Sequence, residues 1–150
     1  METQNQSKNR NVLVTGANKG IGYAIVEALF AGQTPYDIIL TSRDPQLGDQ
    51  AIKEIMEKHP SSHSALSYHQ LNVNDEKSVQ ELVTWLQKTH GKLDVLVTNA
   101  GIYDKDKANE RRLEVLNTNY FSVVNLTQKL LSLLSNDGKI IMISSGLGSL

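Results

Sequence analysis

Apolar positions along the chain alternate between a spacing typical of strands and a spacing typical of helices. Two short runs, Ile38-Ile39-Leu40 and Ile140-Ile141-Met142-Ile143, are apolar at every position. Strands of that kind lie in parallel sheets that are covered by helices on both faces. The pattern predicts five strands, at residues 12–15, 37–41, 65–71, 93–98 and 139–144.

Between these strands, apolar residues recur three and four positions apart, as on a helix with one buried face. The first helix is predicted at residues 20–30. Three further helices follow the apolar series Leu47, Ala51, Ile52, Ile55 and Met56, then Val79, Leu82, Val83 and Leu86, then Leu113, Leu116, Tyr120, Val124, Thr127, Leu131 and Leu134. Asp44 before Pro45 indicates a helix start, and Gly32, Gly91 and Gly138 indicate helix ends.

Strands and helices that alternate in this way predict one α/β domain over residues 1–150, with a polar tail at residues 1–10. We expect a doubly wound parallel sheet in three layers, α/β/α, which stops after the fifth strand. Right-handed crossovers favour the strand order 3-2-1-4-5, with a ligand over the carboxyl ends of strands 1 and 4.

Composition narrows the function classes. Lys plus Arg number 15 and Asp plus Glu 16, so no overall field attracts nucleic acid or an acidic membrane. The absence of cysteine excludes disulfides and thiolate sites, and fits a reducing compartment. Because the first residues are polar and no apolar run approaches membrane-spanning length, we expect a cytoplasmic protein. The histidines predict no metal site, since Pro60 interrupts the interval between His59 and His63.

The most informative segment directly follows the first strand and reads Thr15-Gly16-Ala17-Asn18-Lys19-Gly20-Ile21-Gly22. In this segment Gly16 permits a tight turn, Gly20 lets the backbone approach a phosphate, and Gly22 lets the helix pack close to the sheet. An ordinary glycine turn is the alternative. With the preceding Thr and the intervening Ile, the spacing resembles the short-chain dehydrogenase/reductase family, which implies a Rossmann fold and a nicotinamide coenzyme.

The end of the second strand reads Thr41-Ser42-Arg43, without the carboxylate that would bind a ribose 2′-hydroxyl. Arg43 offers a planar fork of donors to a 2′-phosphate, and Lys19 adds a second positive charge, so NADP is favoured over NAD. Alternatively, both are solvated surface cations. These residues resemble those of the monomeric carbonyl reductases within the family.

Two further strand ends resemble coenzyme-binding motifs of the family. Asn72, followed by Val73, stands where the family has an acidic residue that meets the adenine amino group; a turn asparagine is the alternative. Thr98-Asn99-Ala100-Gly101 resembles the family's Asn-Asn-Ala-Gly, in which small residues admit the coenzyme ribose and Asn99 ties neighbouring strands. A plain turn after the strand is the alternative there.

The resemblance also implies catalytic roles for two residues. Asn119 aligns with an asparagine whose backbone carbonyl holds a water in a proton relay, and Ser145 aligns with a serine that hydrogen-bonds the substrate carbonyl. The alternatives are a solvated helix asparagine and a serine-rich loop. The family's Tyr-x-x-x-Lys pair belongs after that serine, where this sequence does not contain it. Tyr103 and Lys107 have the right spacing, but we reject them because they precede the serine and lie in a charged loop.

The resemblance covers residues 11–150 and corresponds to the amino-terminal half of a family member. It implies NADPH-dependent reduction of a ketone or aldehyde, with a small-molecule carbonyl substrate that the sequence does not identify. A non-catalytic NADP-binding or regulatory protein and an incomplete gene model remain as alternatives. The oligomeric state is not predicted. The fifth strand is expected to form an open apolar edge that favours pairing with another copy or aggregation.

Overall fold

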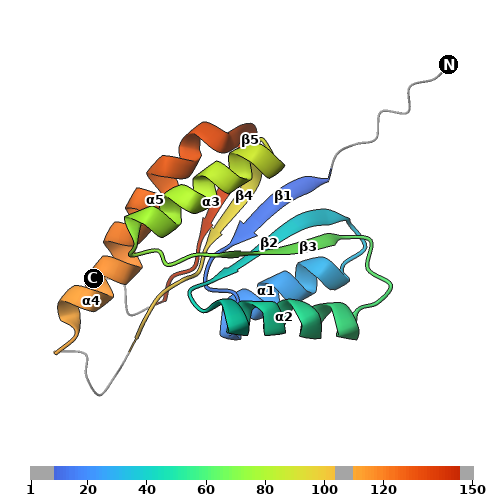
Figure 1. Cartoon of the computed structure of the whole chain (residues 1–150), viewed down its shortest axis with the longest axis horizontal. Coiled ribbons are helices and arrows are strands. Elements are labelled where there is room, and N and C mark those ends of the chain that lie inside the picture. The colour runs from blue at the N-terminus through green and yellow to red at the C-terminus, as the bar shows by residue number, and fades with distance from the viewer. Residues whose placement is uncertain (1–8, 104–109, 146–150) are drawn as a thin grey trace.

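The computed structural model describes residues 9–103 and 110–145 and contains a five-stranded parallel sheet between two layers of helices (Figure 1). The strand order is β3-β2-β1-β4-β5, so the predicted order is confirmed. The strands are β1 (Arg10–Val14), β2 (Tyr36–Ser42), β3 (Ala65–Gln70), β4 (Leu93–Thr98) and β5 (Leu134–Met142). The first strand begins at Arg10, which therefore belongs to the sheet and not to the polar tail.

The helices divide between the two faces of this sheet. In Figure 1, α1 (Gly20–Ala31) and α2 (Pro45–Lys58) lie on one face, and α3 (Glu76–Thr89) and α5 (Ser122–Leu130) lie on the other. Successive residues of a strand point to opposite faces. Accordingly, Leu13 packs in the core beneath α3 and α5, whereas Val12 and Val14 pack in the core beneath α1 and α2. The expected three-layer α/β/α architecture is confirmed.

The start of α2 and the end of α3 follow the signals in the sequence. The Asp44 carboxylate accepts the backbone amides of Gln46 and Leu47 at 2.8 and 3.2 Å, and Pro45 opens α2, as expected. At the end of α3, Gly91 has a φ of 74° and its amide bonds the Leu86 carbonyl. That left-handed conformation favours glycine and ends the helix.

The predicted long helix is helical from Arg112 to Leu133 but not uniform, and its last predicted member, Leu134, is instead the first residue of β5. The regular helix α4 (Arg112–Leu116) passes into a π-helical turn at Asn117–Phe121, then into α5, and ends in a 3₁₀ turn at Leu131–Leu133. A π turn closes its hydrogen bonds one residue later than an α-helix and occurs frequently at functional sites. It falls here on the segment that contains Asn119.

The start of the fifth strand differs from the prediction. Strand β5 begins at Leu134 rather than at residue 139, so Gly138 lies inside it and does not end a helix. Leu93 pairs with Leu134 and Val95 with Lys139, so residues 135–138 bulge opposite Asp94 alone. This bulge has no periodic signal in the sequence. Within the described ranges, no helix is both long and apolar enough to cross a membrane.

Candidate functional site

The glycine segment forms a tight loop between β1 and α1. Gly16 and Gly20 have φ angles of 62° and 61°, a conformation that costs other residues energy. A Cβ on Gly16 would lie 2.8 Å from the Ala100 Cα, and one on Gly22 would lie 2.5 Å from the Asn99 amide nitrogen. A Cβ on Gly20 would meet nothing within 4 Å. Gly16 and Gly22 therefore serve packing, whereas Gly20 borders open space.

Hydrogen bonds fix this loop to the end of β4. The Thr15 hydroxyl accepts the backbone amides of Asn99 and Ala100, both at 2.9 Å. In return, the Asn99 side-chain amide donates to the carbonyls of Thr15 and Gly16, both at 3.0 Å. The prediction that Asn99 ties neighbouring strands is thus seen directly, and Thr15 is an equal partner that the sequence analysis did not assign.

The amino end of α1 is open. The first backbone amides of an α-helix have no partner within it, and among the described residues no side chain caps them at Lys19. On the other side of the loop, the Ala17 amide donates to the Thr41 carbonyl at 2.8 Å, which fixes the loop to β2. Asn18 is half-buried, and Lys19 and Ile21 are exposed. A rigid backbone with free donors and a nearby cation is suited to bind an anion.

Arg43 extends from the end of β2 with its side chain exposed. Its carbonyl accepts the Gln70 side-chain amide at 3.0 Å, so the backbone of the β2–α2 turn is fixed while the guanidinium is accessible. On helix α4, Glu114 forms an ion pair with Arg111. This pair, with a further contribution from the Arg43 charge, holds the pKa of Glu114 below its ordinary value.

The turn after β3 uses its asparagine locally. The Asn72 side-chain oxygen accepts the Asn74 amide at 3.1 Å, and the Asn72 amide donates to the Ser78 hydroxyl at 2.9 Å. Val73 packs against the core beneath α3. The Asn72 oxygen has a second lone pair, so this turn bond is compatible with an additional donor such as an adenine amino group.

Asn119 lies in the π turn, and its side chain is hydrogen-bonded to the segment after β4. Its side-chain oxygen accepts the Ile102 amide and its side-chain nitrogen donates to the Ile102 carbonyl, both at 2.8 Å. A Cβ on Gly101 would approach the Asn119 oxygen to 3.2 Å, which explains the small residue there. The Asn119 side chain thus holds the segment after β4 in place.

Ser145 is exposed and lies beyond the end of β5. Just before it, the Ile143 amide donates to the Thr98 carbonyl at 3.0 Å, so the chain continues beside β4 as far as this point. Of the two residues rejected as the catalytic tyrosine and lysine, Tyr103 is 65% exposed, and Lys107 lies outside the described residues.

Contacts therefore bring together the glycine loop, Asn99, Ala100, Gly101 and Asn119. Arg43, Asn72 and Ser145 stand at the carboxyl ends of β2, β3 and β5, on the same edge of the sheet as that cluster.

Sequence reasoning missed a buried polar cluster at the opposite, amino-terminal edge of the sheet. The Asp94 carboxylate, on a residue only 2% exposed, accepts the Asn11 backbone amide at 2.8 Å and the Ser135 hydroxyl at 2.9 Å, and pairs with the Lys92 ammonium at 3.1 Å. Burial opposes ionisation, but these three donors together hold the pKa of Asp94 below 3.8. The signal in the sequence that could have revealed this cluster was Asp94 itself, a carboxylate inside an otherwise apolar strand.

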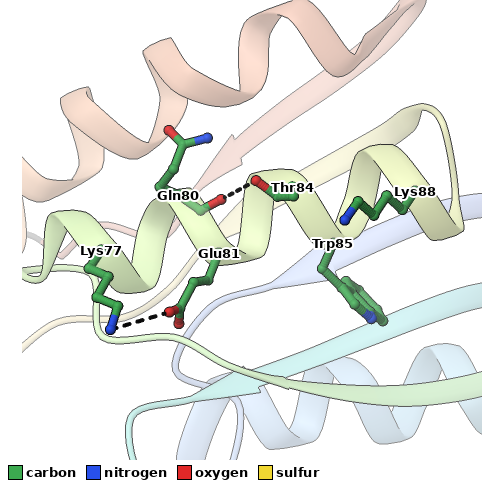
Figure 2. Close-up of a pocket in the computed structure, with 6 residues that line it drawn as sticks. All are labelled: Lys77, Gln80, Glu81, Thr84, Trp85 and Lys88. Atoms are coloured by element: carbon green, nitrogen blue, oxygen red, sulfur yellow. Dashed lines mark hydrogen bonds and ion pairs between the residues drawn. The ribbon is translucent and has the colours of Figure 1, made fainter.

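A hollow on the surface lies elsewhere. Its volume is about 420 Å³, and Figure 2 shows that all six labelled residues around it, including Trp85, come from one face of α3. The Trp85 ring is flanked by His69 and His90, with ring centroids 4.9 and 5.1 Å away. This groove runs along one helix and includes none of the candidate site residues, so it adds nothing to the chemistry of the glycine loop.

Comparison with known proteins agrees with this geometry. The family model described as short chain dehydrogenase matches residues 10–150. Carbonyl reductase (NADPH) 1 of Sus scrofa is 38% identical over 146 residues, which are 93% of this chain and 48% of the relative. Carbonyl reductase (NADPH) 3 of Mus musculus is also 38% identical, over 93% of this chain and 50% of the relative. The chain thus spans about half the length of the curated relatives it matches.

A solved structure gives the same result for the fold. The menthone neomenthol reductase from Mentha piperita superposes with a TM-score of 0.83 at 28% identity, over 94% of this chain and 62% of that one.

Proposed function

Because the chain belongs to the short chain dehydrogenase family, we propose that its glycine loop binds NADP and that the whole protein reduces a ketone or aldehyde with NADPH. The observation that carries the proposal is the open amino end of α1 beside Gly20, where free backbone amides meet space that a side chain would fill. A diphosphate would accept hydrogen bonds from these amides and gain from the helix dipole.

The other strand ends supply the rest of the coenzyme site. Asn99 and Ala100 are half-buried and Gly101 is exposed beside the loop, and the small Ala100 and Gly101 would leave room for a ribose. At the end of β2, Arg43 would hold the 2′-phosphate that distinguishes NADP from NAD. Lys19 would add a second positive charge, and the free lone pair of Asn72 would accept from the adenine amino group.

Two residues would act on the substrate side. When bound, NADPH supplies a hydride to the carbonyl carbon. The exposed Ser145 hydroxyl would donate a hydrogen bond to the carbonyl oxygen, where negative charge develops. The Asn119 side chain would hold Ile102, while its backbone carbonyl would hold a relay water, as the family membership implies.

A coenzyme titration tests the proposal. NADPH and NADH are titrated into the 150-residue chain and followed by coenzyme fluorescence, and we expect NADPH to bind more tightly. In Arg43→Ala the affinity for NADPH should fall about 10- to 100-fold, the value of one or two charge-assisted hydrogen bonds, while NADH binding stays unchanged.

The matched control is Arg10→Ala, at the amino-terminal edge of the sheet, where Arg10 pairs with the exposed Asp137. That variant should bind both coenzymes like the wild-type chain. Equal affinity for NADPH and NADH, or equal losses in the two arginine variants, would contradict the role of Arg43. No binding of either coenzyme would contradict the site itself.

A second candidate concerns the 150 residues by themselves, as a non-catalytic NADP-binding protein. The sequence after Ser145 is Gly146-Leu147-Gly148-Ser149-Leu150 and contains no tyrosine with a lysine four positions later. We therefore expect this chain to bind NADPH but to oxidise it very slowly with any quinone or diketone. Turnover at a rate typical of enzymes, lost in Tyr103→Phe, would overturn this expectation and our rejection of Tyr103.

A further inference from the structure

A line of side-chain hydrogen bonds joins the turn after β3 to the π turn. The Asn72 oxygen accepts the Asn74 backbone amide, and the Asn74 side-chain nitrogen donates to the Thr118 hydroxyl at 2.7 Å. Thr118 is 6% exposed and lies in the π turn, 44 positions along the chain from Asn74. A bond between distant segments constrains both of them.

The same turn is held from two further directions. The Ser122 hydroxyl, at the start of α5, donates to the Thr118 carbonyl at 2.6 Å. The next residue, Asn119, makes its two bonds to the Ile102 backbone. Thr118 thus stands between a contact that leads to the adenosine side of the candidate site and a contact that leads to the segment after β4.

A π turn needs such contacts. It accommodates one more residue than a regular turn, and isolated helices favour the α form. If Thr118 lost its partner on the β3–α3 turn, the helix would be free to change its hydrogen bonding at 117–121. The Asn119 backbone would then move, and the hydrogen bonds between its side chain and the Ile102 backbone would change.

We propose that Asn74 and Thr118 are positioning residues that couple binding of the adenosine part of the coenzyme to the placement of Asn119. The inference rests on the proposed function, because it takes Asn72 to meet adenine and Asn119 to serve the proton relay. A ligand that orders the Asn72 turn also orders the Asn74 side chain, and through Thr118 it favours the π form. Such coupling is reciprocal by thermodynamic linkage.

The coupling can be measured without catalysis. Adenosine 2′,5′-bisphosphate is added to the 150-residue chain, and hydrogen exchange of the Ile102 amide is followed by NMR. That amide reports on the Asn119 contact. The Asn11 amide, bonded to Asp94 at the other edge of the sheet, serves as reference for changes in global stability. We expect the ligand to slow Ile102 exchange about fivefold relative to Asn11.

Substitutions at Thr118 provide the decisive comparison. Thr118→Val keeps the shape but removes the acceptor, whereas Thr118→Ser keeps the hydroxyl. In Thr118→Val we expect faster Ile102 exchange without ligand, ligand affinity within about threefold of the wild type, and loss of the ligand-induced slowing. Thr118→Ser should restore the slowing. Asn74→Ala, on the exposed partner, should reproduce Thr118→Val with less risk to folding.

The outcomes separate this inference from the proposed function. Binding of the bisphosphate with unchanged Ile102 exchange in the wild-type chain would overturn the coupling and leave the coenzyme site standing. The same holds if Thr118→Val and Thr118→Ser respond alike. Failure of the wild-type chain to bind the bisphosphate would overturn both.

Discussion

The two edge strands of the sheet, β3 and β5, carry opposite kinds of side chain. On β3, the residues Ser67, His69 and Gln70 are polar and only Leu66 is buried. On β5, Ile140, Ile141 and Met142 are 37%, 46% and 67% exposed. Natural edge strands avoid unwanted pairing with polar or charged residues. Strand β3 therefore has the composition of an edge strand, and β5 has the composition of an interior strand.

The helices beside the two edge strands also differ, in whether a side chain caps their first turn. Helices α2 and α3, which flank β3, start at the side-chain caps Asp44 and Asp75. Helix α4, on the β5 side, starts at Arg111 without a side-chain cap and buries none of its residues. The difference teaches that capped helices flank the polar β3 edge, whereas the β5 edge leaves apolar side chains exposed beside an uncapped helix.

The largest effect is expected from truncating the buried side chain of the β3 edge. Leu66→Ala should lower the free energy of unfolding by about 3 kcal/mol, because a buried side chain leaves a cavity. Ile141→Ala, at the half-exposed position of β5, should cost about 1 kcal/mol or less. Urea denaturation of both variants measures the difference, and equal losses would contradict the contrast between the edges.

Asp94 is expected to come next, because it anchors β5 through Ser135. Asp94→Ala leaves the buried Asn11 amide without its acceptor and should cost about 2–3 kcal/mol. Asp137→Ala is the matched control, since that carboxylate is 83% exposed in its pair with Arg10 and such pairs contribute under about 1 kcal/mol. Similar losses in the two variants would show that the buried cluster is not an anchor.

The same carboxylate predicts a pH dependence. The folded state lowers the pKa of Asp94 below 3.8, so its contribution to stability is complete above that value and is lost as the pH falls toward the folded pKa. Urea denaturation at pH values from 6 down to 3 should show this loss in the wild-type chain, and Asp94→Asn should flatten the profile. An unchanged slope in Asp94→Asn would assign the acid sensitivity to other groups.

Self-association should follow the apolar edge. We expect the elution volume of the wild-type chain in sizing to depend on concentration, and Ile141→Lys to weaken association about tenfold, or about 1.4 kcal/mol. His69→Lys on β3 should leave it unchanged. A wild-type chain that stays monomeric at every concentration would contradict the expectation for β5.

The smallest effect is expected at the cap of α2, beside β3. Asp44→Ala should cost about 1 kcal/mol, because two backbone amides lose their acceptor. Thermal unfolding of Asp44→Ala and Asp44→Ser measures it, and Ser should keep most of the stability. A larger loss in Asp44→Ser than in Asp44→Ala would rule out capping as the reason.

Sequence reasoning was most successful where a local pattern determines the structure. Apolar runs and the handedness of crossovers were sufficient for the strand order, and the Asp44-Pro45 pair identified the start of α2. The glycine spacing located the loop at the amino end of α1. The roles of Arg43, Asn72 and Ser145 stay predictions, because they depend on a bound coenzyme or substrate.

Features that depend on distant partners could not be predicted. The π turn is held by Asn74 and Ile102, and neither has a local signal near residues 117–121. Similarly, the bulge at Gly138 is opposite Asp94, and the Ser135 that bonds Asp94 lies 41 positions further along the chain. Helical spacing was correct for the apolar face of this segment, but periodicity does not reveal where a helix changes its hydrogen bonding.

The π turn also limits how the chain can be engineered. Each residue of an α-helix rotates the chain by about 100°, so deleting one residue from 117–121 to make the helix regular would turn everything after it by that angle. Leu126 and Leu130, both 1% exposed, would leave the core and polar neighbours would replace them. The additional residue therefore sets the phase of the whole second half of the helix, and a sequence one residue shorter would need a new apolar stripe.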